Sequence, residues 1–190
     1  PKGHTKITES IGYTDYALKQ FFKTAQKQAW YKNTLFVITA DHTSSDPTEE
    51  MSKTNVGRFS IPILFFDPSN PSLKGISLKN FQQTDIMPSV IDYLNIKTQM
   101  ITYGKSFQSD KNFAVYYLNN IYHYINNDYY MAFDGQKAIG LYHFTKDVLM
   151  KNNLLNKEKK TTHEMERFIK AYVQSFNERV INNKLAVKSI

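Results

Sequence analysis

The first apolar pattern along the chain has the period of a helix. Apolar residues and one threonine recur at spacings of three and four, and lysines lie off this stripe. The positions on the stripe are Ile7, Ile11, Thr14, Leu18, Phe21 and Ala25. Because this spacing returns to one face of a helix, it predicts an amphipathic helix over residues 8–28.

Two short apolar runs without charge come next. Residues 35–38 read Leu-Phe-Val-Ile, and residues 61–66 read Ile-Pro-Ile-Leu-Phe-Phe. Both are rich in strand-forming residues and too short for a typical helix, so each predicts a strand. The first run has no alternating polar residue, which indicates a strand covered on both faces, as in a parallel sheet flanked by helices. Pro62 must lie near the start of the second strand or at a sheet edge.

A further helix is predicted over residues 85–95, with Thr84 as its cap and with Asp85 favoured by the positive end of the helix dipole. The order helix, strand, strand, helix is what an α/β layered fold produces. The amino-terminal half of the chain therefore predicts an α/β fold.

The pattern changes from about residue 112 onward. Short Tyr-rich segments and the turn signal Asp134-Gly135 predict a small antiparallel meander. Thr161 and Glu164 have the spacing of a capping box, and apolar residues at helical spacing follow them. We therefore expect a closing helix that ends near residue 183.

Composition and charge narrow the class of protein. With 190 residues, of which 41% are hydrophobic, the chain can bury a sizeable core. The net charge is +7, and residues 151–190 hold nine Lys or Arg against four Glu. Without a Gly-rich or aromatic RNA-binding signature, this basic segment predicts a solvated helix face and no nucleic-acid partner. The absence of Cys excludes disulfides and thiolate metal sites and leaves His, Asp and Glu as strong metal ligands.

The chain has no run of about 18 uncharged apolar residues, so we expect a soluble piece. It starts at Pro1 without an initiator Met, and its first residues read as the approach to a helix. We therefore expect a portion of a longer protein, whose targeting elements lie in the missing part.

Asp41 and His42 stand directly after the first predicted strand. In an open parallel sheet, the carboxyl ends of the strands border the ligand crevice. A carboxylate oxygen and an imidazole nitrogen together suit zinc, manganese or a similar ion. Taken alone, such a pair is more often a cap or a hydrogen-bonded turn.

Four segments in order resemble the sulfatase branch of the alkaline phosphatase superfamily. They are YTDYALKQFFKTAQKQAWYKNTLFVITADHTS, GRFSIPILFFDP, QTDIMPSVIDYLNI and YGKSF. The resemblance covers roughly residues 7–107 and is closest to bacterial lipoteichoic acid synthase and other phosphoglycerol transferases. It implies an alkaline phosphatase-like sheet flanked by helices, present here in part and followed by the meander and the closing helix.

The resemblance implies a divalent metal ion (manganese, calcium, zinc or magnesium) held by Asp41 and His42. In the family, the ion polarises a phosphate or sulfate ester while a Thr, Ser or formylglycine attacks it. That nucleophile lies upstream of the Asp-His pair, so we expect no catalytic residue in this chain and no activity of this piece alone. Thr43 and Arg58 could border the anionic substrate, although an ordinary turn hydroxyl and a surface arginine are the commoner readings.

The family also implies a location and a division of the chain. Its members have a membrane-anchored amino-terminal part and an extracytoplasmic catalytic domain, which places the parent at the periplasmic face of the bacterial inner membrane. Its substrate would be a phosphoglycerol lipid or a sulfated glycan. We expect residues 1–107 to belong to the catalytic domain, and residues 108–190 to form the meander and the basic helix packed on that domain.

Two other classes of function stay open. One is a non-catalytic binding module, in which the aromatic meander and the basic helix hold an anionic glycan or lipid. The other is a purely structural domain, in which Asp41 and His42 satisfy a turn. His123, His143 and His163 lack ligand spacing, and Asp15 is a helix-borne carboxylate near a strand end, so we interpret all four as structural residues.

Overall fold

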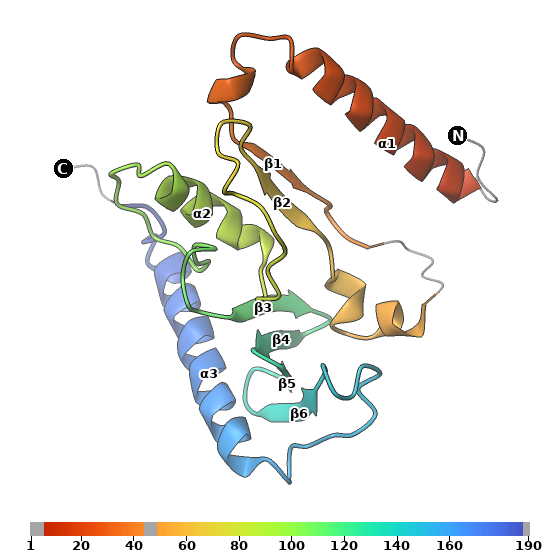
Figure 1. Ribbon diagram of the computed structural model, residues 1–190. Helices are drawn as coiled ribbons and strands as arrows, with labels where there is room; N and C mark the ends of the chain where they lie inside the picture. Colours follow the sequence, from red (N-terminus) through yellow and green to blue (C-terminus); the bar gives the residue numbers. More distant parts are fainter. Residues whose placement is uncertain (1–5, 44–48, 188–190) are drawn as a thin grey trace. The chain divides into compact units, whose positions relative to one another are not determined.

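The computed structural model describes residues 6–43 and 49–187 (Figure 1). The chain forms two compact units. The first contains the residues up to 38 together with 64–76, and the second contains 39–63 together with the residues from 77 onward. This partition interleaves the two units along the chain, and the predicted boundary near residue 107 stays a prediction.

The first unit holds the helix α1 (Lys6–Ala25), the 3-10 helix η1 (Tyr31–Asn33) and most of two strands, β1 (Phe36–Thr39) and β2 (Ile63–Phe66). The two strands form a two-stranded sheet. The predicted first helix and both strands are thus confirmed, with shifted ends. The helix ends at Ala25 because the backbone N–H groups of Lys27 and Gln28 bond three residues back, which tightens the chain into turns.

An aromatic cluster joins α1 to this sheet. The ring centroid of Phe36 on β1 lies 5.2 Å from that of Phe22 and 5.9 Å from that of Phe66 on β2. Residues 36–38 are nevertheless only half-buried. The prediction of a strand covered on both faces is therefore wrong for the described part of the chain, since α1 covers Phe36 through its rings without enclosing the strand.

The second unit contains a four-stranded antiparallel meander and two longer helices. Its elements are η2 (Glu50–Lys53), η3 (Gly57–Phe59), η4 (Gln83–Asp85), α2 (Ile86–Tyr93), β3 (Phe113–Leu118), β4 (Ile121–Asn126), β5 (Tyr129–Phe133), β6 (Ala138–His143) and α3 (Lys159–Ile181). The strand order β3-β4-β5-β6 confirms the predicted meander. Asn119 and Asn120 both have positive φ in the β3–β4 turn, and Gly135 has a φ of 98° after β5. These residue types tolerate that conformation, so short turns can link the strands.

One face of the meander forms the main core with α3. Tyr124, Met131 and Leu141 lie opposite one another on neighbouring strands. They pack with Met165 and Ile169 of α3, which runs along the meander in Figure 1. The helical apolar stripe read from the sequence is thus the stripe that covers the sheet.

Two predicted caps are wrong. The helix α3 begins at Lys159, so Thr161 lies inside its first turn rather than at its cap. The hydroxyl of Thr162 instead donates to the carbonyl of Leu155, at 3.2 Å. Thr84 likewise does not cap α2, because η4 precedes this helix and Asp85 accepts the backbone N–H of Gln82 at 3.0 Å.

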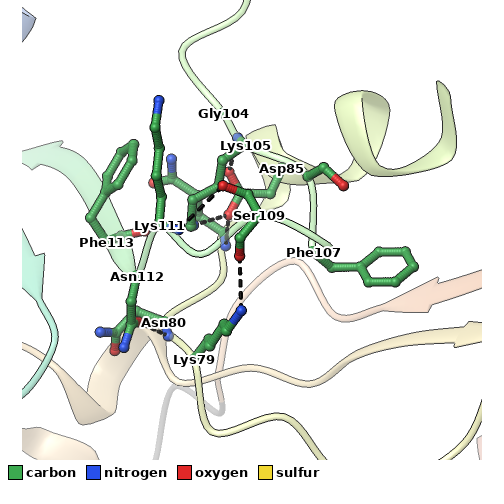
Figure 2. Close-up of polar contacts among 12 residues, drawn as sticks. Lys79, Asn80, Asp85, Gly104, Lys105, Phe107, Ser109, Lys111, Asn112 and Phe113 are labelled. Atoms are coloured by element: carbon green, nitrogen blue, oxygen red, sulfur yellow. Dashed lines mark hydrogen bonds and ion pairs between the residues drawn. The ribbon is translucent and has the colours of Figure 1, made fainter. Parts of the chain in front are cut away.

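Asp85 and Lys105 form an ion pair in the interior of the second unit (Figure 2). The side chain of Asp85 is fully buried, and Lys105 is 6% exposed. Nζ of Lys105 lies 2.6 Å from Oδ2 of Asp85 and donates to the carbonyl of Phe113 at 2.7 Å. The backbone N–H of Lys105 donates to Oδ1 at 2.7 Å. The pair therefore ties η4, the 104–107 segment and β3 together, a larger role than the predicted helix-dipole contact.

None of the helices in the described part of the chain is both long and apolar enough to cross a membrane.

Candidate functional site

The predicted metal ligands lie at the end of β1, exposed to solvent. Oδ1 of Asp41 accepts the backbone N–H of His42 at 2.9 Å. Nδ1 of His42 lies 2.6 Å from the carbonyl oxygen of Thr43. Oδ2 of Asp41 and Nε2 of His42 are 3.5 Å apart. The structure therefore brings one carboxylate oxygen and one imidazole nitrogen to the same spot.

The hydrogen bonds orient this pair. A carbonyl oxygen only accepts, so Nδ1 of His42 carries a proton. In the neutral imidazole, Nε2 then presents the lone pair that a metal-bound histidine uses. The backbone N–H of His42 lowers the pKa of Asp41, which favours the ionised carboxylate. Two ligand atoms on one tetrahedral zinc ion lie about 3.3 Å apart. The 3.5 Å separation therefore suits a shared ion.

The residues present fit a metal ion as two of its ligands. Within residues 6–43 and 49–187 there is no cluster of three or more His, Asp or Glu able to hold an ion. Any site built on Asp41 and His42 thus needs donors beyond those described. The assignment of both residues as ligands stays a prediction.

Two side chains anchor the backbone on either side of the pair. Nε2 of Gln83 donates to the carbonyl of Ala40 at 2.9 Å. The hydroxyl of Thr43 donates to the carbonyl of Arg58 at 2.5 Å. Gln83 belongs to η4, which the buried Asp85 holds in place. The sequence analysis missed Gln83, since the only local signal was a polar run before a predicted helix.

Thr43 and Arg58 are neighbours in space, as their shared hydrogen bond shows. The hydroxyl proton of Thr43 is already donated, so this oxygen offers only acceptor capacity. The charge of Arg58 acts on the meander, where it lowers the pKa of His123 in addition to the larger effect of burial. A substrate contact by Thr43 or Arg58 therefore stays a prediction.

His123 lies in a buried polar cluster on the meander, in keeping with its structural interpretation. Its ring stacks on that of Tyr116, with centroids 4.3 Å apart. Its Nδ1 lies 2.6 Å from the hydroxyl of Tyr130, which also accepts Nδ2 of Asn55 at 3.0 Å. Burial lowers the pKa of His123 and raises that of Tyr130 to about 12. The cluster thus favours the neutral form of both groups.

We expect this cluster to make the chain less stable in mild acid. The pKa of His123 is lowered on folding, so the unfolded chain binds more protons below its ordinary pKa of about 6.5. Stability is therefore fully present above that pH and is lost as the pH falls through it. Urea unfolding at pH 7.5 and 5.5 should show a loss that His123→Gln reduces. The matched change at exposed His163, His163→Gln, should leave the loss intact, and equal losses in all three proteins would contradict the expectation.

Comparison with known proteins gives a family-model match over part of the chain and a fold. The Sulfatase family model matches residues 3–96. A protein of the alkaline phosphatase superfamily from Vibrio parahaemolyticus has a TM-score of 0.74 and 19% identity, and the alignment covers 99% of this chain and 45% of that one. No curated protein matches the chain. The predicted α/β fold of the alkaline phosphatase type is confirmed.

Two further solved structures share this fold. One is a structure described in connection with the metabolism of multiple glycosaminoglycans by Bacteroides thetaiotaomicron. Its TM-score is 0.62 at 16% identity, and the alignment covers 93% of this chain and 45% of that one. The other is a protein in complex with its substrate D-glucosamine-2-N,6-O-disulfate, with a TM-score of 0.56, 15% identity and coverage of 94% and 41%. The chain spans less than half the length of each of these structures.

Proposed function

We propose that this chain, which carries a sulfatase-family domain over residues 3–96, is part of a metal-dependent enzyme that hydrolyses or transfers phosphoglycerol, phosphate or sulfate esters. The observation that carries the proposal is the pair Asp41 and His42, whose ligand atoms lie 3.5 Å apart at the end of β1. The bond of Nδ1 of His42 to the carbonyl of Thr43 leaves Nε2 as the ring nitrogen for a divalent cation, and the family match covers both residues.

When bound, a divalent ion (manganese, calcium, zinc or magnesium) polarises the ester and offsets the charge that develops on it. Asp41 and His42 would hold the ion through Oδ2 and Nε2. Gln83 and Thr43 would keep these ligands in place through the backbone on either side. The remaining ligands and the attacking nucleophile belong, in this proposal, to other parts of the protein, so this piece alone is inactive.

Two classes of substrate fit the proposal. A sulfated glycan is supported by the structural relative in complex with its substrate D-glucosamine-2-N,6-O-disulfate. A phosphoglycerol lipid is supported by the resemblance of residues 7–107 to phosphoglycerol transferases. For either one, the enzyme would act at the periplasmic face of the bacterial inner membrane, with a membrane anchor amino-terminal to this piece. Arg58 and Thr43 would border the anionic group.

The test is ester turnover and bound metal in the full-length protein, with and without Asp41→Ala and His42→Ala. Sulfate, phosphate and phosphoglycerol esters are compared side by side. We expect each substitution to lower both bound metal and turnover by about 100-fold. The ester that the unaltered protein turns over fastest identifies the substrate class. If turnover persists unchanged in both variants, the pair only satisfies a turn. Glycan or lipid binding without any metal dependence would favour the binding module instead.

Gln83 supplies a second, independent prediction at this site. Gln83→Leu removes the donor to the carbonyl of Ala40 and should weaken Mn²⁺ binding to the full-length protein about tenfold, as the loss of an outer-shell contact does. Titration calorimetry measures the change. Gln99→Leu, at an exposed glutamine, is the matched control. Equal Mn²⁺ affinity in Gln83→Leu and the unaltered protein would contradict the expectation.

A further inference from the structure

The segment that carries the two predicted metal ligands is held from two sides. On one side, Gln83 of η4 donates to the carbonyl of Ala40 at 2.9 Å. On the other side, Thr43 donates to the carbonyl of Arg58 in η3, and its own carbonyl lies 2.6 Å from Nδ1 of His42. The contacts that fix η4 and η3 therefore decide how firmly the ligands are placed.

The strand β3 binds η4 directly. Within the part of the chain that the structure describes, β3 pairs with β4 alone, so the backbone of its other edge can bond to side chains. The backbone N–H of Val115 donates to Oε1 of Gln82, the first residue before η4, at 2.7 Å. Lys105, the ion-pair partner of Asp85, donates to the carbonyl of Phe113 at 2.7 Å (Figure 2). Both contacts fix the element that carries the anchor on the β1 side.

The loop before β3 packs closely on η4. Gly104 lies against the carbonyl of Thr84, and a Cβ atom at this position would collide with that oxygen. The backbone N–H of Phe107 donates to Oγ of the fully buried Ser89, which donates to the carbonyl of Asp85 at 2.6 Å. These residues belong to QTDIMPSVIDYLNI and YGKSF, two of the segments that carry the family resemblance. Their contacts join η4 to β3 as one block.

The same strand also holds the segment of η3. The hydroxyl of Tyr116 on β3 donates to the backbone carbonyl of Asn55. The ring centroids of Tyr116 and Phe59 are 4.5 Å apart. Nδ2 of Asn55 donates to the hydroxyl of Tyr130 on β5 at 3.0 Å. Since Arg58 lies between Asn55 and Phe59 in the chain, these contacts place the carbonyl that accepts the anchor on the other side.

The ring and the hydroxyl of Tyr116 are both well defined. The ring is half-buried and stacks on that of His123, with centroids 4.3 Å apart. Burial raises the pKa of Tyr116, so its hydroxyl keeps its proton and remains a donor at neutral pH. A donor held in this way supports a neighbouring site with little loss of entropy.

We propose that β3 positions the metal site, with Tyr116 and Lys105 as positioning residues for the two predicted metal ligands. Tyr116 acts through η3 and Thr43, and Lys105 acts through η4 and Gln83. The proposal rests on the proposed metal-binding function, and it gives the meander a role beyond stability. Contacts one step outside the ligands change metal affinity by about 10–100-fold, and Tyr116 lies farther out, so its effect is smaller.

The experiment is calorimetric titration of the full-length protein with Mn²⁺. Tyr116→Phe removes the hydroxyl and keeps the ring that stacks on His123. We expect it to weaken Mn²⁺ binding about fivefold, with ester turnover recovering at saturating Mn²⁺. The matched control is Tyr117→Phe on the same strand, at a residue that is 57% exposed and whose hydroxyl donates to Asn120 in the β3–β4 turn. The control should leave the affinity unchanged.

Double variants test the two routes. Thr43→Val removes the donor to the carbonyl of Arg58, so Tyr116→Phe should cause no further loss of affinity in this background. The effect of Tyr116→Phe should instead multiply that of Gln83→Leu, which belongs to the other side. Lys105→Met, titrated well below its melting temperature, should add nothing to Gln83→Leu. Thermal melts verify that each titrated variant is folded.

Unchanged Mn²⁺ affinity in Tyr116→Phe would overturn the proposal, and so would an equal loss in Tyr117→Phe. A loss in Tyr116→Phe that is the same with and without Thr43→Val would also overturn it, because the effect would then not pass through η3. These results differ from a failure of the proposed function. In that case the unaltered protein would bind no Mn²⁺, or Asp41→Ala would bind it equally well, and both proposals would fall together.

Discussion

Lys105→Met should lower the free energy of unfolding by about 3–5 kcal/mol, because it leaves the carboxylate of Asp85 buried without its cation. The two backbone N–H groups that also bind this carboxylate remain, but they carry no net charge. Methionine matches the length and packing of the lysine stem, so the loss reports mainly on the charge. Urea unfolding of the 190-residue chain measures it.

Lys79→Met is the matched control for this change. Nζ of Lys79 donates to the carbonyl of Ser109 at 2.8 Å in an exposed position, where water can replace the contact (Figure 2). We expect the control to change stability by less than about 1 kcal/mol. A double variant, Lys105→Met with Asp85→Leu, should recover part of the loss, because no charge is then buried alone. A Lys105→Met protein as stable as the control would show that the ion pair is dispensable.

The second large effect is expected in the core between the meander and α3. Leu141 is fully buried against this core. Leu141→Ala should cost about 2–5 kcal/mol, from lost apolar burial and from the cavity that remains. Ile139, on the same strand, is 41% exposed, so Ile139→Ala should cost roughly 1 kcal/mol. Equal losses in these two variants would mean that the α3-facing side of the meander is not the core.

Sequence patterns were sufficient for the local elements. The stripe of α1, the runs at β1 and β2 and the turn at Gly135 each follow from spacing or residue type, so the elements formed where expected. Helix ends were less accurate. At both Thr84 and Thr161 a suitable capping residue was present, but the helical turns start earlier. The capping box of Gln82 and Asp85 begins η4 before Thr84, and α3 begins at Lys159 without a side-chain cap. Helix ends are the part of an element that residue preferences locate least well.

The candidate site was likewise predicted only in part from the sequence. Asp41 and His42 were proposed from their place at a strand end and from the family resemblance, both of which need only the order of residues. Gln83 was not found, because its contact with Ala40 joins positions 43 residues apart in the chain. No local pattern encodes such a contact. The pairing of Asp85 with Lys105 was not predicted for the same reason, since the partners are 20 positions apart in the chain.

By itself, therefore, the sequence determined the α/β class, the meander, the closing helix and the resemblance on which the metal ligands rest. These follow from periodicity and from residue types that act over a few positions. Only the tertiary structure decided which charges are buried together, which amide anchors the end of β1, and that β3 binds both η4 and the segment of η3. The physical reason is that burial and side-chain pairing depend on distances in space, which the order of residues along a chain does not specify.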